Sequence, residues 1–148
     1  MTRSYRTILL PVDGSVPSRR AAIEAIALAR RLGARIIALH VAPLYEIRSR
    51  RTRRSAEFLD VFEKKVKKKA EGMFSSLARQ CRSARIDCRC HLVWDPITGR
   101  AIARFAQRHR CGLIVMGSHG ESGMRHILMG SIARAVIARS RVPVMVCR

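Results

Sequence analysis

The segment Leu113-Ile-Val-Met-Gly-Ser-His-Gly120 decides the fold more than any other part of the chain, because a buried-strand pattern ends there in a glycine turn. Gly130-Ser131 follows Gly120 after nine residues and precedes a helical pattern over 132–137. Such a strand-to-helix junction suits an anion. Free N–H groups and the positive end of the helix dipole point at it, and glycines let a ligand approach the main chain. Glycines also serve loops that only need tight turns, so both interpretations stand at this point.

Outward from this segment, apolar runs alternate with helical periodicity along the whole chain. The expected strands are residues 7–12, 36–41, 88–93, 113–116 and 142–147. The expected helices run from Ser15 to Gly33, along 59–77, from Pro96 onward, and from Gly130 to the vicinity of Ser140. Because each connection is long enough to carry a helix, successive strands lie parallel. The sequence therefore predicts one domain, residues 1–148, with a doubly wound five-stranded parallel α/β sheet.

Helical spacing also predicts which side chains of three helices face the core. The candidates are Ile23, Ile26, Ala27 and Leu32, then Leu59, Phe62, Val66, Ala70, Met73 and Leu77, then Ile97, Ala101, Ile102 and Phe105. Helices with such faces would cover both sides of the sheet, which strands as apolar as these require.

In open α/β sheets, ligands bind at the carboxyl ends of the strands, where the strand order reverses. Three unusual segments fall at such ends: Asp13 after the first strand, Val41-Ala-Pro43 after the second, and Met116-Gly117 after the fourth. We expect Asp13 to lie beside the glycine loop, where its carboxylate accepts hydrogen bonds from ribose hydroxyls or an adenine amino group. With Gly14, Asp13 also suits a simple turn. Ser131 is placed either to cap the last helix or to donate to a phosphate oxygen.

In these residues the chain resembles the universal stress protein family, in its ATP-binding branch. The family signature G-x2-G-x9-G-[ST] matches Gly117, Gly120, Gly130 and Ser131 without a gap. Further similar blocks are 8–15, His40-Val41, 115–118 and 141–146, so the resemblance covers nearly the whole chain. The chain departs from the family pattern at Cys111-Gly112 and at Trp94, outside the ligand positions.

The resemblance implies a sheet of order 3-2-1-4-5, of the adenine-nucleotide alpha hydrolase-like type, with ATP at the strand ends. The implied nucleotide-binding residues are Pro11, Val12, Asp13, Val41, Met116, Gly117, Gly120, Gly130, Ser131 and Ile132. Asp13 and the Val41 main chain would hold the nucleoside, and the glycine segments with Ser131 and Ile132 would surround the phosphates. The family also implies homodimers built through the last strand, 142–147. Because Asp13 is the only acidic residue expected beside the loop, Mg²⁺ would be held by phosphates and water, with no protein metal site.

The chain lacks the sequence motifs of two other classes of nucleotide-binding protein. There is no G-x4-G-K-[ST] P-loop, and no G-x-G-x-x-G follows the first strand. His119, Arg125 and His126 are candidate phosphate contacts, since cations neutralise phosphate charge. His119 is also conceivable as a general base, but the sequence shows no second acid or nucleophile beside it. We therefore expect a binding protein with no catalytic residue, capable at most of slow ATP hydrolysis or autophosphorylation.

The chain carries a formal net charge of +20, from 30 basic and 10 acidic residues. Arginines crowd residues 48–54 and lysines crowd residues 64–69. Either cluster alone is typical of solvated surface. Together with the global charge, the two clusters indicate a polyanion partner: nucleic acid, an anionic membrane or an acidic protein. Aromatic residues make up only 5% of the chain, so contact with nucleic acid would be to phosphates and blind to sequence.

Two functions remain open at this stage. The first is an ATP-binding stress or signalling regulator whose nucleotide state changes its dimer or partner contacts. The second is a basic interaction protein of the same fold that binds a polyanion, with the nucleotide site incidental. The sequence does not distinguish ATP from AMP or another adenosine ligand.

Cysteine usage and hydropathy bear on the compartment. No run of about 18 apolar residues and no signal-peptide core is present, so we expect a cytoplasmic protein that does not span a membrane. The 5 cysteines form no C-x-x-C pair, which predicts reduced thiols. Cys88-Arg-Cys90-His91 allows a metal site, but residues 88 and 90 share one strand face, which favours burial as small hydrophobes.

Overall fold

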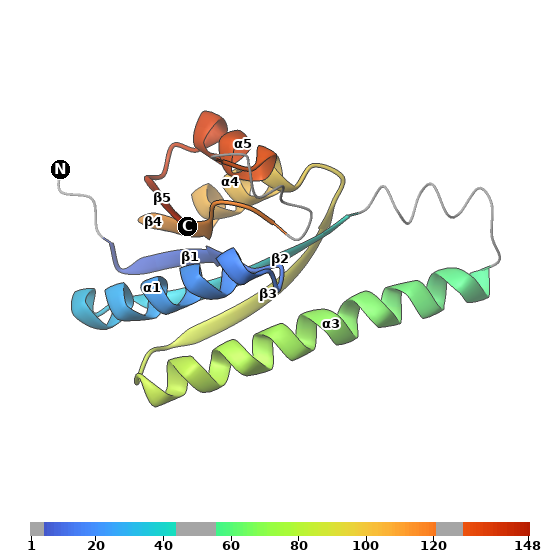
Figure 1. The fold of residues 1–148 in the computed structure, drawn as a ribbon, viewed down its shortest axis with the longest axis horizontal. Helices are drawn as coiled ribbons and strands as arrows, with labels where there is room; N and C mark the ends of the chain where they lie inside the picture. Colours follow the sequence, from blue (N-terminus) through green and yellow to red (C-terminus); the bar gives the residue numbers. More distant parts are fainter. Residues whose placement is uncertain (1–4, 44–55, 121–128) are drawn as a thin grey trace.

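The computed structural model describes residues 5–43, 56–120 and 129–148 (Figure 1). In these ranges strands and helices alternate, as the sequence predicts. The elements are β1 (Thr7–Pro11), α1 (Val16–Leu32), β2 (Arg35–Pro43), α3 (Ala56–Ser83), β3 (Cys88–Asp95), α4 (Thr98–Arg108), β4 (Leu113–Gly117), α5 (Ser131–Arg139) and β5 (Val144–Cys147). Arg125, His126 and the arginine cluster 48–54 lie outside the described residues.

The strands form one parallel five-stranded sheet of order β3-β2-β1-β4-β5. From β1 the chain builds outward to β2 and β3 on one side, and then to β4 and β5 on the other. The reversal of strand order therefore lies between β1 and β4, where ligands of such sheets bind. Both the predicted fold class and the order 3-2-1-4-5 are confirmed.

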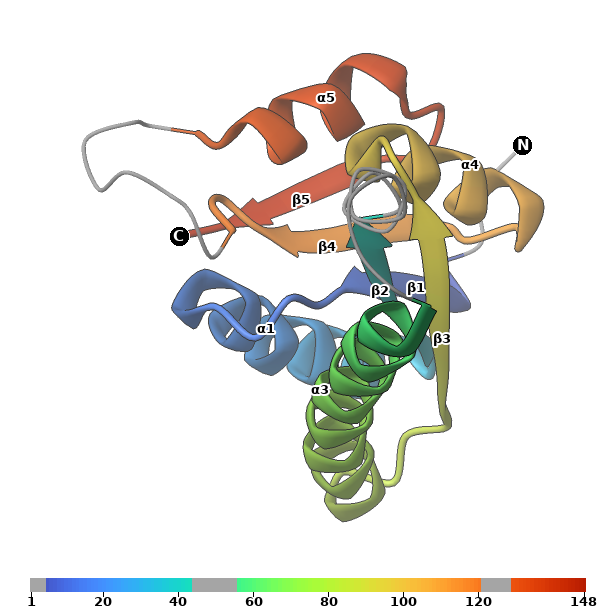
Figure 2. The ribbon, with the colours of Figure 1, turned by 90° about the vertical axis from the view of Figure 1, so that its right-hand side faces the viewer.

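Helices cover both faces of the sheet (Figure 2). α1 and α3 lie on one face, where Ala25 and Leu77 join Leu10 in a first core. α4 and α5 lie on the other face, where Ile102 joins Leu9 in a second core. Successive strand residues alternate between the two cores because their side chains point to opposite faces. β1 and β4 are therefore buried on both sides, which explains their unbroken apolar sequence.

α1 packs through small residues, which differs from the prediction. Its buried residues are Ser18, Ala21, Ala22, Ala25 and Ala29. Ile26 is half-buried, but Ile23 and Leu32 are 61% and 45% exposed and Ala27 is also exposed. The prediction that Ile23, Ala27 and Leu32 face the core is wrong. A stripe of methyl groups lets the helix lie close to the sheet, and helical spacing alone does not reveal that distance.

The other two predicted helix faces hold with one exception. In α3, Ala70 and Leu77 are buried and the remaining predicted residues are half-buried. In α4, Ala101 and Ile102 are buried, but Ile97 is 47% exposed. The prediction for Ile97 is wrong because this residue is the N-cap of α4 and precedes its first turn. Although α3 has 28 residues, neither it nor another described helix is apolar enough to cross a membrane.

Cys81 at the end of α3 meets Cys88 and Cys90 on one face of β3. Cys81 is buried, and the other two are half-buried against the first core. Contact with the Cys81 thiol raises the pKa of Cys88 to about 12, so this thiol stays protonated at neutral pH. Among residues 5–43, 56–120 and 129–148, no three side chains are grouped as metal ligands. The interpretation of these cysteines as small hydrophobes is the one that the packing supports.

Candidate functional site

The loops after β1 and β4 meet at the carboxyl ends of these neighbouring strands. The contact is between Asp13 and Gly120: a Cβ added to Gly120 would lie 2.9 Å from Asp13 Oδ2. The parallel register, which pairs Leu9 with Ile114, brings both loops to the same edge of the sheet. The prediction that Asp13 lies beside the glycine loop is confirmed.

Asp13 holds the turn after β1 with one carboxylate oxygen and faces the glycine loop with the other. Its Oδ1 accepts a hydrogen bond from the Ser15 N–H at 2.9 Å. Between them, Gly14 has a φ of 87°, a left-handed conformation that favours glycine. Ser15 in turn caps α1, because its side chain accepts a hydrogen bond from the Ser18 N–H at 3.2 Å. The turn role and a ligand role for Asp13 are therefore compatible.

Ser118 and His119 form a side-chain pair inside the glycine loop. Ser118 Oγ lies 2.9 Å from His119 Nδ1, and Ser118 is only 3% exposed. His119 Nε2 is buried and has no hydrogen-bond partner among the described residues. A buried polar atom without a partner costs about 1–3 kcal/mol. When the Ser118 hydroxyl donates to Nδ1, the ring proton sits on Nε2 and needs an acceptor that the described residues do not supply.

Gly130 closes the glycine loop from the other side. Its N–H donates to the Ser118 carbonyl at 2.7 Å, and a Cβ at Gly130 would come within 3.0 Å of that same oxygen. Gly130 is also the N-cap of α5, so the unpaired N–H groups of the first helical turn lie beside the loop. Ser131 is the first helical residue, which makes the capping role wrong and leaves its hydroxyl exposed. Ile132 follows it and is 38% exposed.

Packing against α1 excludes a side chain at Gly117. A Cβ there would lie 2.7 Å from the Pro17 carbonyl carbon and 2.9 Å from the Ser18 nitrogen. Pro17 and Ser18 belong to the first turn of α1, so Gly117 lets this helix lie against β4. Met116 is 5% exposed and its side chain belongs to the second core. Only the main chain of Met116 can therefore contribute to the site.

The main chain of Val41 points past the end of β1. Pairing of β1 with β2 ends at Pro11 and Leu39, and the Val12 N–H donates to the Leu39 carbonyl at 2.8 Å. Main-chain groups two residues apart on a strand point the same way, so those of Val41 face the same side as those of Leu39, beyond the last residue of β1. The Val12 carbonyl is already engaged, because His40 Nδ1 donates to it at 2.7 Å.

Sequence reasoning assigned no individual role to His40 or Ser118. His40 is 9% exposed and ties β2 to the end of β1 through the Val12 carbonyl. Ser118 orients His119 and accepts the Gly130 N–H on its carbonyl. Both are polar residues within apolar segments, and this pattern could have indicated their roles from the sequence, since buried polar groups are normally hydrogen-bonded.

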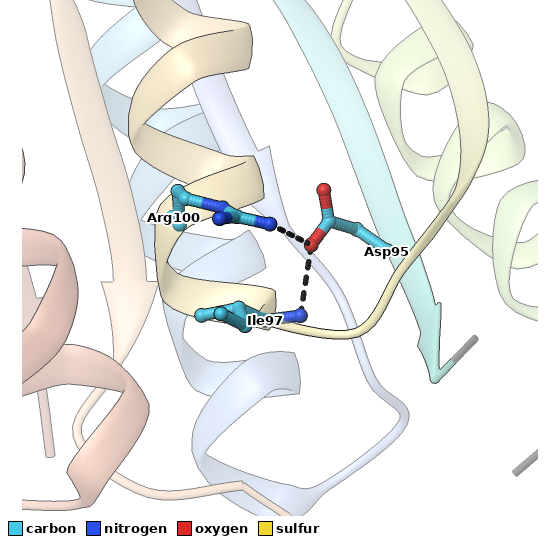
Figure 3. A network of polar contacts seen from close by, with 3 residues as sticks. All are labelled: Asp95, Ile97 and Arg100. Atoms are coloured by element: carbon cyan, nitrogen blue, oxygen red, sulfur yellow. Dashed lines mark hydrogen bonds and ion pairs between the residues drawn. The ribbon is translucent and has the colours of Figure 1, made fainter. Parts of the chain in front are cut away.

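Asp95 is a second acidic residue at the carboxyl ends of the strands, but it is tied to α4 (Figure 3). Its Oδ1 accepts a hydrogen bond from the Ile97 N–H at 2.8 Å and lies 3.5 Å from an Arg100 guanidinium nitrogen. β3 is also an edge strand, separated from β1 by β2. Asp95 therefore stabilises the start of α4, whereas Asp13 is the carboxylate in contact with the glycine loop.

The sequence relatives are universal stress proteins. The sequence model of the universal stress protein family matches residues 4–148. Universal stress protein MJ0531 of Methanocaldococcus jannaschii is 26% identical over 144 residues, covering 97% of this chain and 82% of the relative. A universal stress protein of Thermus aquaticus is 29% identical over 146 residues, covering 97% of this chain and 99% of the relative.

Solved structures share the fold over almost the full length. The structure of MJ0577, also from Methanocaldococcus jannaschii, matches with a TM-score of 0.85 and 26% identity over 97% of this chain and 96% of that one. A universal stress protein in complex with cAMP matches with a TM-score of 0.69 at 20% identity, covering 98% of each chain. One from Archaeoglobus fulgidus in complex with dAMP has a TM-score of 0.66 at 24% identity, covering 98% of this chain and 99% of that one. Because the family match runs from residue 4 to residue 148 and the strand order agrees with it, this chain belongs to the universal stress protein family.

Proposed function

We propose that this chain binds an adenine nucleotide, ATP with Mg²⁺, at the carboxyl ends of β1, β2 and β4, and acts as a nucleotide-dependent stress or signalling regulator. The observation that carries the proposal is the buried His119 Nε2, which has no partner in the described chain and belongs to the loop between Asp13 and Gly130. Two proteins of this fold were solved with adenine nucleotides, one with cAMP and one with dAMP, which supports this class of ligand.

The nucleoside would bind between Asp13 and Val41. Asp13 Oδ2 is the oxygen for ribose hydroxyls, because Oδ1 already accepts the Ser15 N–H. The Val41 carbonyl would accept from the adenine amino group, and its N–H would donate to a ring nitrogen, as a neighbouring strand would do. Pro11 and Val12 form the half-buried floor beside them at the end of β1.

The phosphates would lie between the glycine loop and the start of α5. His119 Nε2–H donates to one phosphate oxygen, and the first N–H groups of α5, including that of Ile132, face others. An anion at a helix N-terminus gains about 0.3–1 kcal/mol from the dipole. The exposed Ser131 hydroxyl adds a donor. Arg125 and His126 stay sequence-based candidates for the same phosphates.

The same residues favour binding over catalysis. In the described part of the chain no three side chains converge as metal ligands, so phosphates and water would hold Mg²⁺. Ser118 and His119 have the separation of a nucleophile and its base, but Ser118 is 3% exposed and its hydroxyl is directed to the ring. We therefore propose slow hydrolysis or autophosphorylation at most.

Isothermal titration calorimetry with ATP, AMP and cAMP tests the proposal on Asp13→Asn and His119→Ala. Asp13→Asn retains an acceptor for the Ser15 N–H but removes the charge that faces Gly120. Each variant should lose about 1–3 kcal/mol of ATP binding free energy, the usual effect of removing a hydrogen bond to a charged group. Repeating the ATP titration with EDTA measures how much Mg²⁺ contributes to the ATP binding free energy.

The matched control is Asp87→Asn, which removes one exposed carboxylate just before β3, at the opposite end of the sheet from the glycine loop. It should bind ATP like the wild type. If wild type binds none of the three nucleotides at millimolar concentration, or if Asp87→Asn loses as much as Asp13→Asn, the site is not where we place it.

A further inference from the structure

The helical layer formed by α4 and α5 has arginine as its only charged residue. Between 96 and 120 and between 129 and 148 the described chain contains no aspartate or glutamate. The arginines there are Arg100, Arg104, Arg108, Arg110, Arg134, Arg139, Arg141 and Arg148. α3 is different, because acidic residues are interspersed with its lysines and Lys64 forms an ion pair with Asp60 at 2.6 Å. The structure thus moves the strongest anion-binding candidate from the lysine cluster of α3 to the layer of α4 and α5.

On α4 the arginines form a ridge. Arg100, Arg104 and Arg108 are spaced by four residues, so they lie on one face about 6 Å apart along the helix axis. Arg100 is paired with Asp95, but Arg104 and Arg108 are exposed and form no ion pair with a described residue. Like charges at this spacing repel each other, and an anionic partner would remove the repulsion.

Beside the ridge, three aromatic rings pack together. His91 of β3 lies with its ring centre 5.3 Å from Phe105 and 5.5 Å from His109, and Phe105 and His109 stack at 3.9 Å with planes 18° apart. His109 is exposed at the end of α4. Burial, and after it the nearby His109 and Arg89, lower the pKa of His91. Among the residues that the structure describes, no carboxylate pairs with the neighbouring Arg104 and Arg108, so a phosphate would supply their counter-charge.

We propose that the α4 ridge and the ring cluster form a binding surface for single-stranded nucleic acid, with phosphates on Arg104 and Arg108 and a base stacked on His109. The arginine fork matches phosphate oxygens, and unpaired bases stack on aromatic side chains. An anionic membrane fits less well, because interfacial helices insert large apolar side chains, and from Ile97 to Arg110 the one exposed is Ile97, at the opposite end of α4 from His109.

This surface is separate from the proposed nucleotide site. α4 starts near the carboxyl end of β3 and runs back along the sheet, so His109 lies close to Gly112, whose N–H donates to the Thr7 carbonyl at the start of β1. The glycine loop lies at the opposite ends of β1 and β4. The nucleotide-binding proposal and the nucleic-acid-binding proposal can therefore be disproved independently of each other.

Fluorescence anisotropy with a labelled mixed-sequence RNA 12-mer tests the proposal in a salt series. The variant Arg104→Gln/Arg108→Gln should bind more weakly and flatten the slope of log affinity against log salt by about 1.4, since each phosphate contact of a single strand contributes about 0.7. His109→Ala should lose about tenfold in affinity, because it removes the ring on which a base would stack.

The matched control is Lys67→Gln/Lys68→Gln, which removes two exposed charges from α3 instead. It should change neither affinity nor slope by more than a small fraction. Equal losses in the two double variants would show that binding follows net charge, and would overturn the proposal. So would tighter binding to the matching duplex or to phosphatidylserine vesicles, or no binding at 50 mM salt. ATP titration and thermal unfolding of each variant verify that the fold and the other site are intact.

Discussion

At the scale of single residues, the glycines of one motif serve different purposes. Gly117 is in contact with the main chain of α1, whereas Gly120 faces the side chain of Asp13. Gly130 caps α5 and donates to the Ser118 carbonyl. A motif written as spaced glycines treats these positions alike, but an added Cβ would meet the main chain of a helix at Gly117 and a side chain of the candidate site at Gly120.

This difference predicts opposite behaviour for Gly117→Ala and Gly120→Ala. The Cβ at Gly117 would press on the Pro17 and Ser18 main chain, which cannot move without shifting α1. Unfolding free energy in urea should fall by about 1–3 kcal/mol, as for overpacked cores. Among the described residues, the Cβ at Gly120 would meet a single atom, a carboxylate oxygen that can turn away, so stability should stay near wild type while ATP affinity measured by calorimetry falls. Similar losses of stability in both variants would contradict this distinction.

At the scale of elements, close approach depends on small residues at the contacts. α1 reaches the sheet through alanines, and α4 crosses α5 at Gly99, where an added Cβ would lie 2.6 Å from Ala135 Cβ and 3.4 Å from the Ile132 carbonyl. Because Ile132 stands in the first turn of α5, this crossing also positions the helix start beside the glycine loop. Packing between two helices thus contributes to the geometry of the candidate site.

Two helical glycines test this view in opposite directions. Gly99→Ala should lower the free energy of unfolding by about 1–3 kcal/mol, since α4 and α5 must separate. Gly72 lies on α3, where no atom of the described residues is within 4 Å of an added Cβ, so Gly72→Ala should raise stability by up to about 1 kcal/mol through helix propensity. Urea denaturation measures both changes. A stabilising Gly99→Ala would mean that the two helices are not in close contact.

At the scale of the whole molecule, β5 is an edge strand and we expect it to pair with a second copy. The Pro143 carbonyl accepts a hydrogen bond from Ile114 of β4, and the Cys147 carbonyl accepts one from Ser118 just after β4. The main-chain groups of Val144 and Val146 therefore point away from β4 to the open edge. These outward groups are the ones that a two-fold partner strand would use.

The variant Val146→Pro tests this dimer because it removes an outward N–H and none of the bonds to β4. Light scattering at tens of micromolar should give a dimer for wild type and a monomer for Val146→Pro. Val146→Ala is the matched control, since it shortens the same side chain and keeps the N–H, and it should remain a dimer. A monomeric wild type, or a dimeric Val146→Pro, would contradict pairing through this edge.

The resemblance to the universal stress protein family implied the strand order that brings Asp13 beside the glycine loop. The sequence by itself determined the alternation of strands and helices and the parallel sheet. These features follow from local periodicity and from the rule that parallel strands end at one edge. The long apolar runs of β1 and β4 require helices on both faces of the sheet, because such strands must be covered on both faces.

Only the tertiary structure decided which face of α1 is buried, why Gly117 is a glycine, and how His119 is oriented. Each depends on distances between segments far apart in the chain: α1 against the sheet, Pro17 against Gly117, and Gly130 against Ser118. The grouping of His91 with Phe105 and His109 has the same origin, since β3 and α4 meet only after folding. Periodicity identifies an apolar face, but the space available to a side chain is set by its neighbours across the core.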